Sequence, residues 1–176
     1  GLHRLYESKI FVYPEVLTMQ NQNILSVAET NNGILFMGTT NGVFFLPSTS
    51  MQKPINIDAT KRLAVYSLLP DNSDGIWLGT ANGLYYIPFP HLSKPYTQRL
   101  SASHIQKEYA ADAVILSLAK DSTQRLWIGT QNKGLLCLEK GTIISPQAVS
   151  ELRNEIISSL TTSRDGTLWI TTWNGG

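Results

Sequence analysis

The residues of this sequence that could do acid–base chemistry are aspartates close to predicted turns. Asp74 and Asp165 each precede a glycine, and Asp71 and Asp121 lie nearby. Glycosidase chemistry needs two carboxyl groups that face each other across the scissile bond. These aspartates instead follow a sequence repeat, and Asp is favoured in turns because its carboxylate hydrogen-bonds to nearby backbone. We therefore predict that they shape turns and that the segment has no catalytic residue.

The sequence also gives no sign of a metal site, a catalytic nucleophile or a phosphate-binding loop. The histidines His3, His91 and His104 have no metal-ligand spacing, and the Gly-Lys-Ser/Thr of a phosphate loop is missing. Cys137 lies in a predicted buried strand and is interpreted as a small core residue. A nucleophile occurs once, whereas these serines occur once in each repeat: Ser26, Ser67, Ser117 and Ser159. The sequence predicts no metal, no cofactor and no enzyme activity for this segment.

Composition narrows the function classes further. Of the 176 residues, 42% are hydrophobic and only 15% are charged, and the formal net charge is +1. Such a chain can bury a core, and it lacks the basic stripe that nucleic-acid phosphates require. No apolar run approaches the roughly 18 residues that would span a bilayer, and no signal peptide is visible. We expect no nucleic acid or membrane contact, and a chain that is cytosolic or a mature or excised piece of something longer.

The elements that carry these residues come from an internal repeat of about 40–50 residues, the length of a four-stranded propeller blade. Four segments align without gaps: 24–39, 65–80, 115–130 and 157–172. Each predicts a β-hairpin whose second strand carries an aromatic residue, followed by a third strand and a weaker fourth. The predicted fold is therefore all-β, a partial β-propeller of about four blades, each a four-stranded antiparallel sheet.

The predicted organisation is a single segment over residues 1–176. Its repeat cores are 24–46, 65–87, 115–138 and 157–176, while residues 1–13 match the third and fourth strands of a preceding or closing blade. Two arrangements remain open. The ends could pair with each other and close a four-bladed ring, or the chain could be part of a larger propeller, which we favour. Open blade faces and strand edges would then join other blades or associate with themselves.

Two cores carry a family resemblance: GIWLGTANGL at 75–84 and RLWIGTQNKGL at 125–135. They closely resemble the two-component regulator propeller repeat. Phe36, Thr171 and the missing Asp-Gly turn of the third copy depart from that pattern without changing the expected fold. The resemblance implies a periplasmic or extracellular sensor region, placed before a membrane helix and a histidine kinase. It also implies an oligosaccharide as the ligand, because many relatives sense polysaccharide breakdown products.

Propeller ligands usually meet the loops at one end of the central channel. On this chain those loops are the turns after the second strands and the links into the next blade, and they predict a ligand site that includes Asn41, Asn82, Asn132, Lys133 and Trp173. The long insertion from Pro88 to Asp112 adds Tyr96 and Arg99, and its best short-helix candidate lies around 103–111. In contrast, the repeated Trp77, Trp127 and Trp169 are predicted to lie in the core between blades.

The leading hypothesis is a non-catalytic sensor segment that recognises an oligosaccharide. One alternative is a propeller that serves as a protein-interaction scaffold, because fold does not fix function. The other is a propeller-type lyase or hydrolase whose active site lies in blades not present here. An enzyme of that kind needs a unique cluster of His, Glu or Asp near the channel, and this segment offers none.

Overall fold

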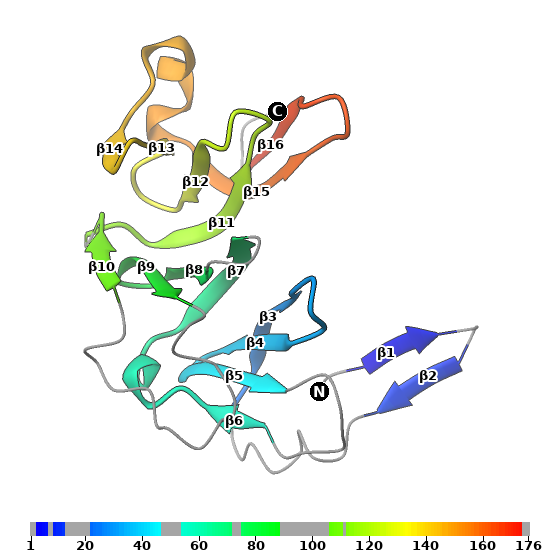
Figure 1. Ribbon diagram of the computed structural model, residues 1–176. Helices are drawn as coiled ribbons and strands as arrows, with labels where there is room; N and C mark the ends of the chain where they lie inside the picture. The colour runs from blue at the N-terminus through cyan, green and yellow to red at the C-terminus, as the bar shows by residue number, and fades with distance from the viewer. Residues whose placement is uncertain are drawn as a thin grey trace.

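The computed structural model describes residues 3–6, 9–12, 22–46, 54–71, 75–88, 106–110 and 112–173. Nearly all of the regular structure in these ranges is antiparallel strand, with short 3₁₀ helices in two links between blades. The predicted propeller fold is confirmed, because the strands form successive four-stranded sheets in which neighbours along the chain pair with each other. Figure 1 shows these sheets following one another, with their first strands side by side.

Three blades are complete. Blade 1 contains β3 (Ile24–Glu29), β4 (Leu35–Thr39), β5 (Gly42–Leu46) and β6 (Ile55–Asn56). Blade 2 contains β7 (Val65–Asp71), β8 (Gly75–Thr80), β9 (Gly83–Pro88) and β10 (Gln106–Tyr109). Blade 3 contains β11 (Ile115–Lys120), β12 (Leu126–Thr130), β13 (Leu135–Glu139) and β14 (Thr142–Ile144). The third strands, and the fourth strands β6 and β14, lie where the repeat predicts them.

Two further sheets have two strands each. We call the pair β15 (Ile156–Thr162) and β16 (Leu168–Trp173) blade 4, and β1 (His3–Tyr6) pairs with β2 (Lys9–Val12). Among the described strands, β16 pairs with β15 and β1 pairs with β2, so no ring-closing pair joins the two sheets. The choice between a closed ring and a larger propeller therefore stays a prediction.

One predicted element is wrong. The short helix expected around 103–111 is instead β10, the fourth strand of blade 2, where the structure describes this segment. Gln106 is opposite Tyr86 and Tyr109 is opposite Leu84 on β9. The free edge of β9 supplies backbone hydrogen-bond partners that only an extended chain can use, and this outweighs the local helical preference.

The core lies between blades rather than inside any one of them. Each blade has an upstream face toward the preceding blade and a downstream face toward the next. Phe36 and Phe45 on the downstream face of blade 1 pack against Ile76 and Leu78 on the upstream face of blade 2. Equivalent clusters join blade 2 to blade 3 and blade 3 to blade 4. Cys137 is buried in the last of these, as predicted for a core residue.

The repeated serines and glycines allow the blades to approach closely. Ser67 is opposite Gly79, and Ser117 is opposite Gly129, on the first two strands of their blades. A β-carbon on Gly129 would overlap Ser117 Oγ and lie 2.7 Å from Ile157 Cγ2 of the next blade. Only glycine fits at this position, because Ser117 and Ile157, the β-branched residue near the start of the first strand of blade 4, leave no room for a side chain. This contact confirms that the serines are structural.

Asp121 and Asp165 shape turns, as predicted, whereas Asp71 is the last residue of β7. In blade 3, Asp121 Oδ1 accepts hydrogen bonds from the backbone nitrogens of Thr123 (2.9 Å) and Arg125 (3.1 Å). Asp121 Oδ2 accepts from Arg125 Nε at 2.8 Å and from the indole Nε1 of Trp127 at 2.9 Å. In blade 4, Asp165 Oδ1 accepts from the backbone nitrogen of Thr167 at 3.0 Å. The sequence did not indicate that the blade 3 aspartate also fixes the core tryptophan.

Candidate ligand-binding face

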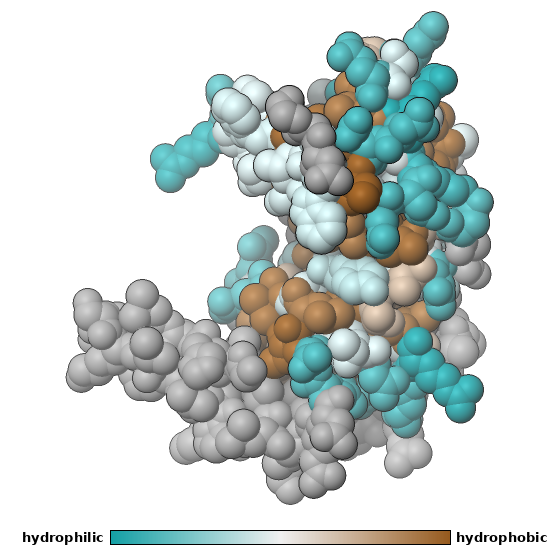
Figure 2. Space-filling model, turned by 180° about the vertical axis from the view of Figure 1, so that it is seen from behind, coloured by the Kyte–Doolittle hydropathy of each residue, from teal (hydrophilic) through white to brown (hydrophobic). Residues whose placement is uncertain are grey.

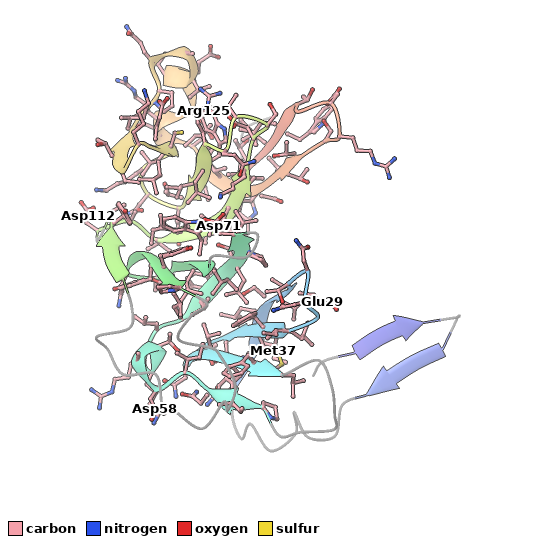
Figure 3. The ribbon with its side chains drawn as sticks, in the orientation of Figure 1. Glu29, Met37, Asp58, Asp71, Asp112 and Arg125 are labelled. Carbon is pink, nitrogen blue, oxygen red and sulfur yellow. The ribbon has the colours of Figure 1, made fainter. Side chains whose placement is uncertain are left out.

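The loops that were predicted to bind ligand gather at one end of the blades. Antiparallel strands alternate in direction, so the turn after the second strand and the link after the fourth emerge at the same end. Figure 3 shows Asp58 and Asp112, which belong to the links, on the side opposite Glu29, which ends β3 at the first hairpin turn. We call the end that carries the links the link face, and the other end the hairpin face.

Two of the predicted asparagines hold the link face together. Asn41 Oδ1 accepts a hydrogen bond from the backbone nitrogen of Arg62 at 2.8 Å, which ties the blade 1 turn to the link into blade 2. Asn132 Oδ1 accepts from the nitrogen of Val114 at 3.1 Å, and its Nδ2 donates to the carbonyl of Asp112 at 3.0 Å. Their amides are thus engaged with backbone, although both residues remain exposed.

Asn82 and Lys133 differ from these two asparagines. Asn82 is exposed, and its backbone rather than its side chain is engaged: the backbone nitrogen donates a hydrogen bond to Thr80 Oγ1 at 3.0 Å. Lys133 Nζ forms an ion pair with Asp112 on the neighbouring link. The hydrogen bond from Lys133 lowers the pKa of the Asp112 carboxyl below its usual value. Asn82 therefore has the predicted amide most accessible to a ligand.

The aromatic candidate Trp173 lies in a different setting from the one predicted. The sequence suggests a turn after the second strand, whereas the structure places Trp173 as the last residue of β16. It is 66% exposed, and Trp169 on the same strand is 61% exposed. The prediction that the repeated tryptophans lie between blades holds for Trp127, which is 9% exposed, and for Trp77, which packs against the cluster between blades 2 and 3. For Trp169 it stays a prediction. Blade 4 has no described blade on its downstream face to cover the indole.

The remaining candidates, Tyr96 and Arg99, lie outside the described residues, so their predicted roles stay predictions. The same holds for Asp74, His91 and His104. In the described part of the insertion, the ring of Tyr109 lies 5.9 Å from that of Trp77, measured between ring centroids. The insertion thus contributes Tyr109 to the hydrophobic cluster between blades 2 and 3.

The hairpin face carries features that sequence reasoning missed. A small open hollow is lined by Thr123, Gln124 and Arg125 from one turn and by Leu138, Glu139 and Lys140 from the next. Nearby, Lys120 of blade 3 forms an ion pair with Asp71 of blade 2, which also accepts a hydrogen bond from Trp77 Nε1 at 3.2 Å. No repeat position predicts this pair, because the other blades have no lysine at the place of Lys120.

The described side chains offer little reactive chemistry. Within the ranges that the structure describes, no three His, Cys, Asp or Glu residues gather as metal ligands would. Burial raises the pKa of the Cys137 thiol, which disfavours the nucleophilic thiolate. No helix in the described ranges is long and apolar enough to cross a membrane.

Comparison with known proteins bears on the repeat. The model of the two component regulator propeller family matches residues 110–132 and 151–174, in the third and fourth repeats. This confirms the resemblance that the sequence indicated. No curated protein matches the chain.

Solved structures show the same fold. The extracellular domain of a hybrid two-component system from B. thetaiotaomicron is 25% identical over 85% of this chain, with a TM-score of 0.61. A second such domain from the same organism is 22% identical over 85% of the chain, with a TM-score of 0.62. In both cases the match spans only 20% of the other chain.

An enzyme is also among the structures with this fold. A virginiamycin B lyase from Staphylococcus aureus is 17% identical over 88% of this chain and 50% of its own, with a TM-score of 0.62. At that identity the likeness shows the propeller fold alone, because propellers serve many unrelated activities.

Proposed function

We propose that this chain, two of whose repeats match the two component regulator propeller family, is a non-catalytic sensor segment of a bacterial two-component signalling protein. The observation that carries the proposal is the family match to two repeats, together with the likeness to extracellular domains of hybrid two-component systems. Since the chain spans a fifth of those domains, the segment would contribute a few blades to a much larger sensing region. Its location would be periplasmic or extracellular.

We further propose that the link face contributes to recognition of an oligosaccharide. Sugars present hydroxyl groups that both donate and accept hydrogen bonds, and an amide side chain such as that of Asn82 can do both. Sugars also present flat apolar patches of C–H groups, which pack against exposed aromatic rings such as that of Trp173. The low charge of the chain suits a neutral ligand.

The signalling assignment is tested by the reading frame that encodes the chain. We expect further propeller repeats, then a membrane-spanning helix and a histidine-kinase region downstream of Gly176. Sequencing the flanking DNA checks this directly. A reading frame that lacks a histidine kinase, or that continues into a catalytic domain of another kind, would overturn the sensor assignment whatever the propeller binds.

The ligand class is tested with the chain itself. Isothermal titration of the chain with neutral oligosaccharides of defined length is expected to find at least one binder. Asn82→Ala and Trp173→Ala should each weaken its binding about three- to tenfold, the loss expected for one hydrogen bond or one ring contact. Asn31→Ala is the matched control, because Asn31 is also exposed but lies in the first hairpin turn, on the opposite face.

Asn132→Ala provides a second comparison in the same titration. Its amide ties a link to a turn, so this variant is expected to lower the melting temperature of the free chain, which Asn82→Ala should leave unchanged. If no oligosaccharide binds, or if Asn31→Ala weakens binding as much as Asn82→Ala does, the link-face site is wrong.

A further inference from the structure

The hairpin face of blade 3 carries an open hollow of about 430 Å³, which is within the size range of sites for small molecules. The hollow lies between the turn that joins β11 to β12 and the turn that joins β13 to β14. Polar and charged side chains predominate in its lining, which consists of Thr123, Gln124, Arg125, Leu138, Glu139 and Lys140. Figure 2, seen from behind, shows mostly hydrophilic residues at the top of the molecule, where blade 3 lies. The hollow therefore suits a polar ligand.

Two residues of this lining carry a side chain where the backbone favours glycine. Gln124 has a φ of +66°, and glycine takes its place in the turns of blades 1 and 4, as Gly33 and Gly166. Lys140 has a φ of +48° in the next turn. This left-handed conformation is strained for a residue with a β-carbon, and strain of this kind clusters at ligand sites. The two strained positions thus point to a use for both side chains.

The hollow has positively charged donors that are available to a ligand. Arg125 Nε donates to Asp121 Oδ2 at 2.8 Å, and Arg125 Cζ lies 5.3 Å from the ring centroid of Trp127. These contacts hold the guanidinium in place, while its Nη atoms have no hydrogen-bond partner among the described residues. Lys140 is exposed, and its ammonium group forms no ion pair within the described ranges. An arginine and a lysine placed in this way favour a carboxylate as ligand.

The acidic residue in the lining restricts the kind of acid that fits. Glu139 forms no ion pair with a described residue, and its carboxylate can accept hydrogen bonds from hydroxyl groups but repels a second negative charge. The amide of Gln124 can both donate to hydroxyl groups and accept from them. The Asp121 carboxylate does not compete, because it is buried and accepts its hydrogen bonds from its own hairpin. The lining therefore matches one carboxylate flanked by hydroxyl groups.

We propose that the hollow on the hairpin face of blade 3 binds a polyhydroxy acid, a small ligand with one carboxylate flanked by hydroxyl groups. Arg125 and Lys140 bind its carboxylate, while Glu139 and Gln124 bind its hydroxyl groups. All of these residues belong to blade 3, and they lie at the opposite end of the blades from the link face. The proposal therefore depends neither on the sensor assignment nor on the link-face site.

A nuclear magnetic resonance titration of the chain with three probes tests the ligand class. Glucuronate carries a carboxylate and hydroxyl groups, glucose carries only hydroxyl groups, and acetate carries only a carboxylate. The indole N–H of Trp127 donates to Asp121, which also accepts from Arg125, so the assigned indole signal should shift when Arg125 binds a carboxylate. Glucuronate is expected to bind at least about tenfold more tightly than glucose or acetate, because each of these lacks one set of hydrogen bonds.

Two variants separate a role in binding from a role in the fold. Gln124→Gly and Lys140→Asn place residues that tolerate left-handed backbone at the strained positions, so each should raise the melting temperature by about 2–4 °C. Gln124→Gly should weaken glucuronate binding about threefold and Lys140→Asn at least about tenfold. Arg62→Asn is the matched control, because Arg62 is also an exposed cation with a positive φ, +72°, but lies on the link face. It should raise the melting temperature similarly and leave binding unchanged.

Three results would overturn the proposal. The first is an indole signal of Trp127 that does not shift with glucuronate. The second is glucose or acetate binding as tightly as glucuronate, which would show that the hollow does not recognise both groups together. The third is a Lys140→Asn chain that binds glucuronate as the wild type does, or an Arg62→Asn chain that loses as much affinity, since either would place the binding outside the hollow. None of these results bears on Asn82 or on the link face.

Discussion

Replacing Gly129 by alanine is expected to lower the free energy of unfolding by about 2–3 kcal/mol, the upper part of the range for overpacked cores. The added β-carbon would overlap Ser117 Oγ and lie 2.7 Å from Ile157 Cγ2, so both the hairpin and the junction with blade 4 must shift. Urea unfolding followed by tryptophan fluorescence gives the free energy.

The same repeat position in blade 4 supplies the control for this measurement. Thr171 is exposed, so Thr171→Ala should change stability by no more than about 0.5 kcal/mol, as expected for a surface substitution. The double variant Ser117→Ala/Gly129→Ala should recover part of the loss, because it removes the overlapping Oγ but retains the contact with Ile157. If Gly129→Ala is as stable as the wild type, the close approach of blades 3 and 4 is not as the structure shows it.

Removing the Asp121 carboxylate should have an effect of similar size. Asp121→Ala leaves Arg125 and the buried indole nitrogen of Trp127 without their acceptor, and such losses cost about 2–4 kcal/mol. Asp165→Ala is the comparison in blade 4, where the turn is exposed and no buried indole depends on the carboxylate, and its effect should be smaller. Equal effects of the two substitutions would show that the Trp127 contact contributes nothing.

Asp121 also makes stability depend on pH. Burial alone would raise its pKa, but the hydrogen bonds from Thr123, Trp127 and Arg125 outweigh burial and hold the pKa well below the usual 3.8. A carboxyl with a lowered pKa in the folded state stabilises the fold fully above its unfolded pKa, and this contribution is lost as pH falls through the folded pKa. The wild type should therefore lose stability as pH falls below about 4, and Asp121→Ala should lose less over that interval.

The repeat made most of the architecture predictable, because the same residues recur wherever the same contact recurs. Strand positions, the inter-blade location of Trp127 and the structural role of Ser117 all follow from that recurrence. The features that the repeat did not predict depend on neighbouring segments, which differ from blade to blade. For example, β10 is extended because β9 offers it an edge.

The sequence predicted where the candidate site residues lie, but not which of their side chains are accessible to a ligand. Placing Asn41, Asn82 and Asn132 at one end of the blades required only strand direction, and this was correct. Which amides remain accessible depends on the links, whose lengths and sequences differ between blades. The links engage the amides of Asn41 and Asn132, whereas Asn82 lies where no described link reaches its amide with a hydrogen bond.

The contact between a blade-opening β-branched residue and the glycine of the blade before it has a consequence for how such proteins change over generations. Val65, Ile115 and Ile157 make the same contact at the three internal junctions, so a duplicated unit would arrive with this part of its joint already compatible. In blade 4, Thr171 takes the place of that glycine, and a unit inserted after blade 4 would have to adapt to it.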